Sequence, residues 1–247
     1  MTFNTIEKTL NLYLQQGIDD FLEKCRGNGS LISSSSISQV WKIGVGADNY
    51  YCKFYFRARK SIMAPFLKSR ARREWENLQL FKTLEIPVPP TIAFIEERSL
   101  FGYHCGCLIT REIKNCTDLS TLFKKGYPLL KDRHWLSQVI NKIATYLKRV
   151  HGINFYHGDL KCRNILVSLE AQPEVYFIDS PQGKIKKGRQ VDDLLTLDKR
   201  AMRELSRTQR LRFYLSYLNK KMLSTRDKKD IRRLLRRQAA VVNGVYS

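Results

Sequence analysis

The side chains best suited to chemistry are two aspartates and an asparagine in the second half of the chain. Asp159 lies in a turn, and Asn164 follows five residues later at the start of the apolar segment 165–167. Asp179 ends a second apolar segment, residues 175–178. Two strands of a small hairpin would aim Asn164 and Asp179 at one point, and both offer the oxygen ligands that Mg²⁺ prefers. Asp159 would then lie beside the metal, where it can accept a proton from a hydroxyl.

A lysine and a glutamate in the first half of the chain complete this set. Lys53 lies in the aromatic-rich segment 50–56, which has the composition of a strand, and its ammonium can reach phosphates. An ammonium held in a cleft needs a carboxylate to position it, because a buried charge without a partner is costly. Glu74 and Glu76 both lie on the predicted helix 69–84. The residues alone therefore predict a lysine–glutamate pair, but they do not decide which of the two glutamates is the partner.

The elements that must position these side chains form a β-rich part followed by a helical part. Residues 4–25 have the apolar spacing of an amphipathic helix, and the helix 69–84 interrupts an antiparallel meander of short strands. The predicted strands are 30–37, 39–45, 50–56, 91–96, 106–111, 165–167 and 175–178. The predicted long helix of the second part is 132–151, and the apolar spacing is again helical from about residue 190 to about residue 240. We therefore predict an α+β fold with an N-terminal helical extension (1–29), a β-rich part (30–112) and a mainly helical part (113–247).

The charge of the chain points to an anionic partner. Lys and Arg number 44 in 247 residues against 23 Asp and Glu, so the formal net charge is +21. This surplus predicts nucleic acid, an anionic membrane surface or a phosphate-rich substrate as partner. The cations concentrate in residues 53–73, 184–189 and 199–237, which either bind such a partner or form solvated faces. In the last predicted helix, Ile231 and Leu234 belong to an apolar stripe that either packs in the core or lies in a membrane interface.

The order of the chemical residues resembles the protein-kinase-like fold. That fold has a strand lysine, a helix glutamate, a catalytic-loop aspartate with an asparagine five residues later, and a metal-binding aspartate at a strand end. The resemblance implies a bilobal α+β protein, with a small antiparallel β-lobe that carries one αC-type helix and a mainly helical C-lobe. Three features depart from the pattern. Residues 33–36 are serines where a glycine-rich nucleotide loop is expected. Residues 180–183, Ser-Pro-Gln-Gly, stand where Phe-Gly normally follows the metal-binding aspartate, and no Ala-Pro-Glu follows.

Longer segments resemble the lipopolysaccharide kinase family, the Kdo/WaaP and InaA-like group. These segments are residues 108–113, 155–167, 176–183 and 193–214. The resemblance implies transfer of the γ-phosphate of ATP to a sugar hydroxyl, of heptose or Kdo, in the inner core of lipopolysaccharide. It also implies a peripheral protein at the cytoplasmic face of the inner membrane of a Gram-negative bacterium. The implied partners are the lipid A-core acceptor and the anionic membrane surface, and no nucleic acid is expected.

The kinase-like resemblance assigns a role to each residue of the set. It makes Asp159 the catalytic base, and Asn164 and Asp179 the ligands of Mg²⁺. It makes Lys53 the residue that binds the α- and β-phosphates of ATP. Glu74 then orients Lys53, because the family pattern places this acid just before an aromatic residue, which is a tryptophan here.

Three further residues have weaker assignments. Lys161, two residues after Asp159, is expected to neutralise charge on the transferred phosphoryl group, as in Ser/Thr kinases, or to be an ordinary exposed lysine. Asp193 begins a predicted helix and either braces the catalytic loop from behind or caps its own helix. His157 is expected to be a packed structural histidine rather than a base.

Two alternatives remain open at this stage. One is an atypical protein kinase of the RIO or Bud32 type, because residues 86–90 and 178–182 resemble segments of RIO kinases and the net charge also suits RNA. Residues 193–214 fit the lipopolysaccharide family better. The other is a pseudokinase that only binds nucleotide, which the intact set of lysine, aspartates and asparagine argues against.

Overall fold

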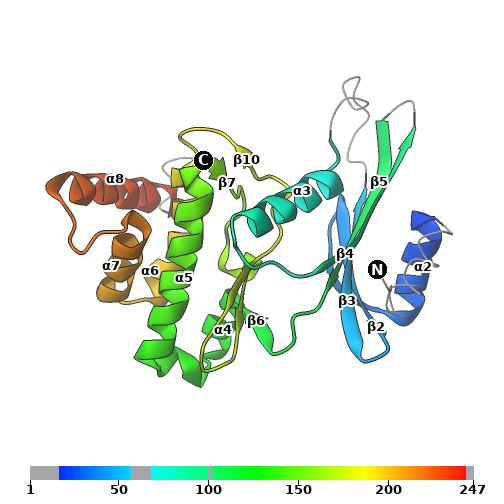
Figure 1. The fold of residues 1–247 in the computed structure, drawn as a ribbon, viewed down its shortest axis with the longest axis horizontal. Coiled ribbons are helices and arrows are strands. Elements are labelled where there is room, and N and C mark those ends of the chain that lie inside the picture. Colours follow the sequence, from blue (N-terminus) through cyan, green and yellow to red (C-terminus); the bar gives the residue numbers. More distant parts are fainter. Residues whose placement is uncertain (1–16, 57–67, 100–101, 243–247) are drawn as a thin grey trace. The chain divides into compact units, whose positions relative to one another are not determined.

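The computed structural model of the protein describes residues 17–56, 68–99 and 102–242, and the chain divides into two compact units (Figure 1). The first unit comprises residues 1–79 and 89–113, and the second comprises residues 80–88 and 114–247.

The first unit is built on an antiparallel sheet. Its strands within the described residues are β1 (Ser30–Ser34), β2 (Ser38–Val45), β3 (Asp48–Phe56), β4 (Thr91–Ser99) and β5 (Gly102–Arg111), in the order β1-β2-β3-β5-β4. The predicted meander is therefore confirmed, and β3 pairs on both sides, with β2 and with β5. Strand β3 is therefore the middle strand of this sheet.

Helix α2 (Ile18–Asn28) covers one face of this sheet. Its Phe21 and Cys25 are buried in one cluster with Tyr50, Cys52 and Phe54, which share one face of β3. The helical extension predicted for residues 1–29 is thus part of the first unit, because its apolar face completes the core of the sheet. The portion of the predicted helix at residues 4–16 lies outside the described residues.

Helix α3 (Arg70–Thr83) covers the opposite face of the sheet (Figure 1). A close approach at Gly106 of β5 makes this packing possible, because a Cβ there would lie 2.8 Å from the Cβ of Ala71. The prediction placed residues 80–88 with the β-rich part, whereas the structure places them in the second unit. The reason is contact with distant segments: the ring of Phe81 packs on Phe155, and the carbonyl of Pro87 accepts a hydrogen bond from the backbone N–H of Phe177.

The second unit centres on α5 (Arg133–Gly152), whose buried residues form one long stripe. Asp132 caps this helix by accepting hydrogen bonds from the N–H groups of His134 and Trp135, at 2.8 and 3.2 Å. The remaining elements are β6 (Cys116–Asp118), α4 (Leu119–Lys125), β7 (Phe155–Tyr156), β8 (Ile165–Ser168), β9 (Val175–Phe177), β10 (Lys184–Ile185), α6 (Gln190–Glu204), α7 (Arg207–Leu218) and α8 (Thr225–Val242), with short 3₁₀ turns at Pro128–Lys131 and Cys162–Asn164. Strands of two or three residues, such as β6, β7 and β10, show no readable period, and the sequence did not predict them.

The last helix packs its apolar stripe inside the protein. Leu234 is buried, Ile231 and Leu235 are half-buried, and α8 lies against α6. Of the two readings left open for this stripe, the structure therefore supports core packing. The cations of the helix face solvent, and they include Lys228, Lys229, Arg232, Arg233 and Arg236. In the described part of the chain, no helix has both the length and the apolar character needed to cross a bilayer.

Candidate active site

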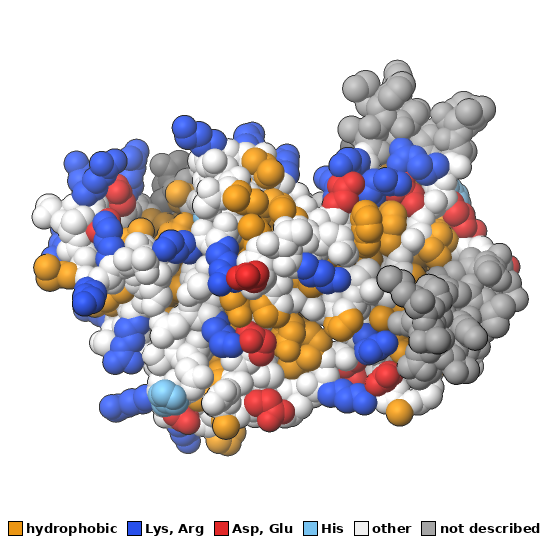
Figure 2. All heavy atoms as spheres, viewed as in Figure 1, with side chains coloured by type: hydrophobic (Ala, Val, Ile, Leu, Met, Phe, Trp, Pro, Cys, Tyr) orange, Lys and Arg blue, Asp and Glu red, His pale blue; other side chains and the backbone are white. Residues whose placement is uncertain are grey.

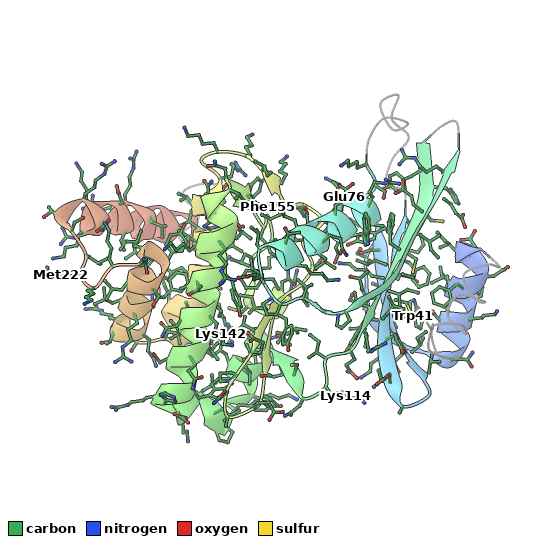
Figure 3. The ribbon with its side chains drawn as sticks, in the orientation of Figure 1. Trp41, Glu76, Lys114, Lys142, Phe155 and Met222 are labelled. Atoms are coloured by element: carbon green, nitrogen blue, oxygen red, sulfur yellow. The ribbon has the colours of Figure 1, made fainter. Side chains whose placement is uncertain are left out.

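The first unit holds the predicted lysine–glutamate pair. The Nζ of Lys53 lies 3.0 Å from Oε2 and 3.2 Å from Oε1 of Glu74, so the ammonium meets both carboxylate oxygens. The exposed fractions of the two side chains are only 16% and 5%. Glu76 lies on the same helix (Figure 3) but pairs with Lys68, at 2.8 Å. The structure therefore selects Glu74 as the partner of Lys53.

The pleat of β3 explains this pairing. Tyr50, Cys52 and Phe54 face α2, so the alternate residues Lys53 and Tyr55 lie on the face that α3 covers. The hydroxyl of Tyr55 donates a hydrogen bond to Glu74, and the Nζ of Lys53 lies 5.1 Å from the centre of the Tyr55 ring. Sequence reasoning did not assign Tyr55, although its position two residues after the lysine on a strand is a readable signal. Lys53 is thus a largely buried residue on an interior strand.

In the second unit, the hairpin of β8 and β9 brings Asn164 close to the end of β9. Ile165 pairs with Phe177, and the backbone N–H of Ile178 donates to the carbonyl of Asn164 at 3.1 Å. Asp179 follows directly, with a φ of 59° in the left-handed region. Non-glycine residues in that region are uncommon and are often functional. The hairpin predicted from the sequence is thus present, with the register that places Asn164 and Asp179 at one end.

Asp159 is fixed by contacts from the turn that follows it. The Nδ2 of Asn164 donates to the carbonyl oxygen of Asp159 at 2.8 Å and to its Oδ2 at 3.2 Å. The Nζ of Lys161 lies 2.6 Å from Oδ1, and an Nη of Arg163 lies 3.8 Å from Oδ2. The exposed fraction of the Asp159 side chain is 20%. One carboxylate is thus held in a cationic setting while part of it stays accessible, as a base requires.

The donor set of this turn suits Mg²⁺. Both hydrogen bonds of the Asn164 side chain come from its Nδ2, and its Oδ1 has no hydrogen-bond partner among the described residues. The carboxylates of Asp179 and Asp159 act on the same buried histidine, His157. Together with the amide oxygen of Asn164 they provide the hard oxygen ligands that Mg²⁺ prefers. A divalent cation would also offset the repulsion between the two carboxylates.

His157 has the packing role expected from the sequence. Its ring is buried and stacks on Phe81, with ring centres 6.0 Å apart. Burial lowers the pKa of His157, although the charges of Asp193, Asp179 and Asp159 act in the opposite direction. Its Nε2 lies 3.1 Å from the carbonyl oxygen of Ile178, and because a carbonyl can only accept, Nε2 carries the proton. The His157 ring thus ties the loop to the strand end just before Asp179.

Asp193 braces the same loop from α6. Its exposed fraction is 1%, and its two carboxylate oxygens accept hydrogen bonds from the N–H groups of His157 and Gly158, at 2.5 and 3.0 Å. The Nε2 of His151 lies 3.3 Å from Asp193 Oδ2, and the Nδ1 of His151 lies 2.7 Å from the Tyr217 hydroxyl. Burial, followed by the charge of Asp193, raises the pKa of Tyr217 to about 12. The bracing role expected of Asp193 is confirmed as a contact, and the helix begins three residues earlier, at Gln190.

We expect Asp193→Asn to destabilise the protein by about 2–4 kcal/mol, because two backbone N–H groups, one of them buried, would lose a shared carboxylate and one would face an amide N–H₂. Urea unfolding measures this change. A suitable control is Glu204→Gln on the same helix, whose ion pair with Arg200 lies near the surface and should be worth less than about 1 kcal/mol. Equal stability of the two variants would contradict the bracing role.

Other sequence predictions have a more limited outcome. Lys161 contacts Asp159 rather than standing free in solvent, although its side chain is about half exposed. Of the basic run at residues 53–73, the part at 57–67, with Arg57, Arg59 and Lys60, lies outside the described residues. The sequence did not identify His151 as the residue that contacts Asp193, nor Tyr217 as the residue that contacts His151, since nothing local distinguishes them.

Comparisons with known proteins agree with this chemistry. A sequence model described as "Lipopolysaccharide kinase (Kdo/WaaP) family" matches residues 38–236. A curated protein of Actinobacillus succinogenes, "3-deoxy-D-manno-octulosonic acid kinase", is 30% identical over 111 residues, which cover 44% of this chain and 43% of the relative. The matched segment therefore spans less than half the length of that relative. A solved structure described as "WaaP in complex with acyl carrier protein" matches with a TM-score of 0.71 and 16% identity over 96% of each chain, a likeness of fold.

Proposed function

The chain belongs to the lipopolysaccharide kinase (Kdo/WaaP) family, and from this we propose that it transfers the γ-phosphate of ATP to a sugar hydroxyl of the lipopolysaccharide inner core. The observation that carries the proposal is the turn in which the Asn164 amide binds Asp159 while the β8–β9 register brings Asp179 alongside. Kdo and heptose are both candidate acceptors. The name of the curated relative favours Kdo.

The finer architecture belongs to the same proposal. We take the two units to be the lobes of a protein-kinase-like fold, with α3 as the αC-type helix. The antiparallel sheet, the pairing of Lys53 with Glu74 and the likeness to WaaP support this assignment. The reaction would take place at the cytoplasmic face of the inner membrane, and the net charge of +21 suits both an anionic bilayer and an anionic acceptor.

Each residue has a defined task in the proposed reaction. Asp159 accepts the proton of the acceptor hydroxyl, and Lys161, held 2.6 Å from it, offsets negative charge on the transferred group. Lys53 binds the α- and β-phosphates of ATP, and Glu74 fixes the direction of its ammonium. Asn164 and Asp179 would hold Mg²⁺, which neutralises charge on the phosphates when it is bound. Phosphoryl transfer rests mainly on such positioning and charge neutralisation.

The proposal is tested by incubating the purified protein with ATP, Mg²⁺ and core lipopolysaccharide that lacks the phosphate in question. We expect one phosphate to be added per acceptor, and mass spectrometry of the core oligosaccharide identifies the sugar. Ribosomal RNA, ribosomes and casein serve as parallel acceptors. Transfer to one of these and none to any core acceptor would favour an atypical protein kinase and reject the sugar-kinase assignment.

A further inference from the structure

The segment that follows Asp179 is hydrogen-bonded to the residues that lead into the catalytic turn. We call residues 180–187 the strap. Strand β10 of the strap pairs antiparallel with β7 (Figure 1), in the register Lys184 to Tyr156 and Ile185 to Phe155. The backbone N–H of Lys186 donates to the carbonyl of Asn154 at 2.8 Å. The strap therefore has a fixed course beside the residues that lead into Asp159.

Two further contacts place the strap next to the catalytic turn itself. The hydroxyl of Ser180 donates to the carbonyl of His157 at 3.1 Å. Gly158 has a φ of 83°, and a Cβ on it would lie 3.0 Å from the backbone carbonyl carbon of Gln182. Only glycine meets both demands, a left-handed backbone and the close approach of another chain segment. The backbone of the strap thus passes close to the residue that precedes Asp159.

The strap carries three exposed lysine side chains. Lys184, Lys186 and Lys187 are exposed, and none of them forms an ion pair with any carboxylate in the described residues. By contrast, Arg189 pairs with Asp192 at 2.7 Å, just beyond the strap. Three cations within the four residues 184–187 repel one another, and an anionic ligand would relieve that repulsion.

The strap also presents an apolar side chain. Ile185 stands between the lysines with an exposed fraction of 66%. A single exposed isoleucine is common on protein surfaces, so the argument for a ligand rests on the lysines that flank it. In the view of Figure 1, β10 lies at the upper edge of the second unit, and Figure 2 shows Lys and Arg side chains along that edge.

We propose that the strap is the acceptor-binding subsite, in which Lys184, Lys186 and Lys187 bind phosphate or carboxylate groups of the acceptor close to the hydroxyl that is phosphorylated. The proposal rests on the proposed sugar-kinase function and adds a requirement to it: the acceptor must carry its own anionic groups beside the reacting sugar. The backbone ties to residues 154–158 give the strap a fixed position relative to Asp159, so the bound anions also position the hydroxyl.

The test compares two triple variants that lose the same charge. One is Lys184→Ala with Lys186→Ala and Lys187→Ala. The control is Lys228→Ala with Lys229→Ala and Arg232→Ala, three exposed cations of α8. With core lipopolysaccharide in neutral detergent, we expect the strap variant to raise the acceptor KM roughly ten- to fifty-fold and to leave the ATP KM unchanged, and added salt should shrink the difference. The α8 variant should stay within about two-fold of the parent.

Several outcomes would overturn the proposal. They are an unchanged acceptor KM in the strap variant, an equal rise in both variants, and a rise seen only in anionic vesicles. The last would assign the lysines to lipid headgroups. A dephosphorylated core should bind the parent less tightly and reduce the difference between parent and strap variant.

Binding of core lipopolysaccharide without ATP separates this proposal from the proposed function. If the parent binds the core and the strap variant does not, the subsite stands even where phosphoryl transfer is not observed. If the parent transfers phosphate but both proteins bind the core equally, the subsite is rejected and the kinase assignment remains.

Discussion

Replacing Asp159 with asparagine is expected to lower the rate of phosphoryl transfer by roughly 10²-fold or more while ATP binding persists. The change removes the group that takes the proton of the acceptor hydroxyl. It leaves the shape of the turn largely intact, because the backbone carbonyl of residue 159 still accepts the 2.8 Å hydrogen bond from Asn164. Lys53 and Glu74 belong to the other unit and keep their pairing.

The measurement is turnover under saturating ATP and acceptor, together with the Kd of Mg·ATP by calorimetry. Glu170→Gln, an exposed acid on the loop between β8 and β9, is the matched control and should behave as the parent does. Turnover of the Asp159 variant close to that of the parent, on any acceptor, would remove this residue from the role of base.

The parts of the site that the sequence predicted are those that local spacing fixes. The alternation of side chains along a strand places Lys53 on one face of β3, and the pairing of two short strands brings Asn164 near the strand end that precedes Asp179. The choice of Glu74 over Glu76 did not follow from spacing, and it came from a resemblance to known kinases. The ion pair in the structure agrees with it.

The parts that the sequence could not predict depend on contacts between distant segments. Asp193 is 36 residues from His157, and only the packed unit shows that its carboxylate accepts the loop N–H groups. Strand β10 has two residues, so its pairing with β7 leaves no periodic signal. The apolar stripe of α8 had two readings because amphipathic spacing is the same for a core helix and an interfacial helix. The burial of Leu234 decided between them.

Replacing Asp179 with asparagine is expected to weaken the binding of Mg·ATP itself, and to lower phosphoryl transfer by roughly 10²-fold or more at fixed, subsaturating ATP. A neutral amide binds Mg²⁺ more weakly than a carboxylate does, so the loss should appear in the Kd of Mg·ATP. Affinity for ATP measured with excess chelator should change little. In the Asp159 variant the Kd of Mg·ATP is preserved, and this contrast separates a metal ligand from a base.

The backbone at Asp179 makes asparagine the informative substitution. With a φ of 59°, the residue lies in the left-handed region, which asparagine and aspartate adopt more readily than other non-glycine residues. Asp179→Asn should therefore keep the stability of the parent, whereas Asp179→Ala should lose about 1 kcal/mol in urea unfolding through backbone strain. If the folded asparagine variant binds Mg·ATP as tightly as the parent, Asp179 is not a metal ligand. In that case its left-handed conformation serves the course of the strap, and the metal must be held by Asn164 with Asp159.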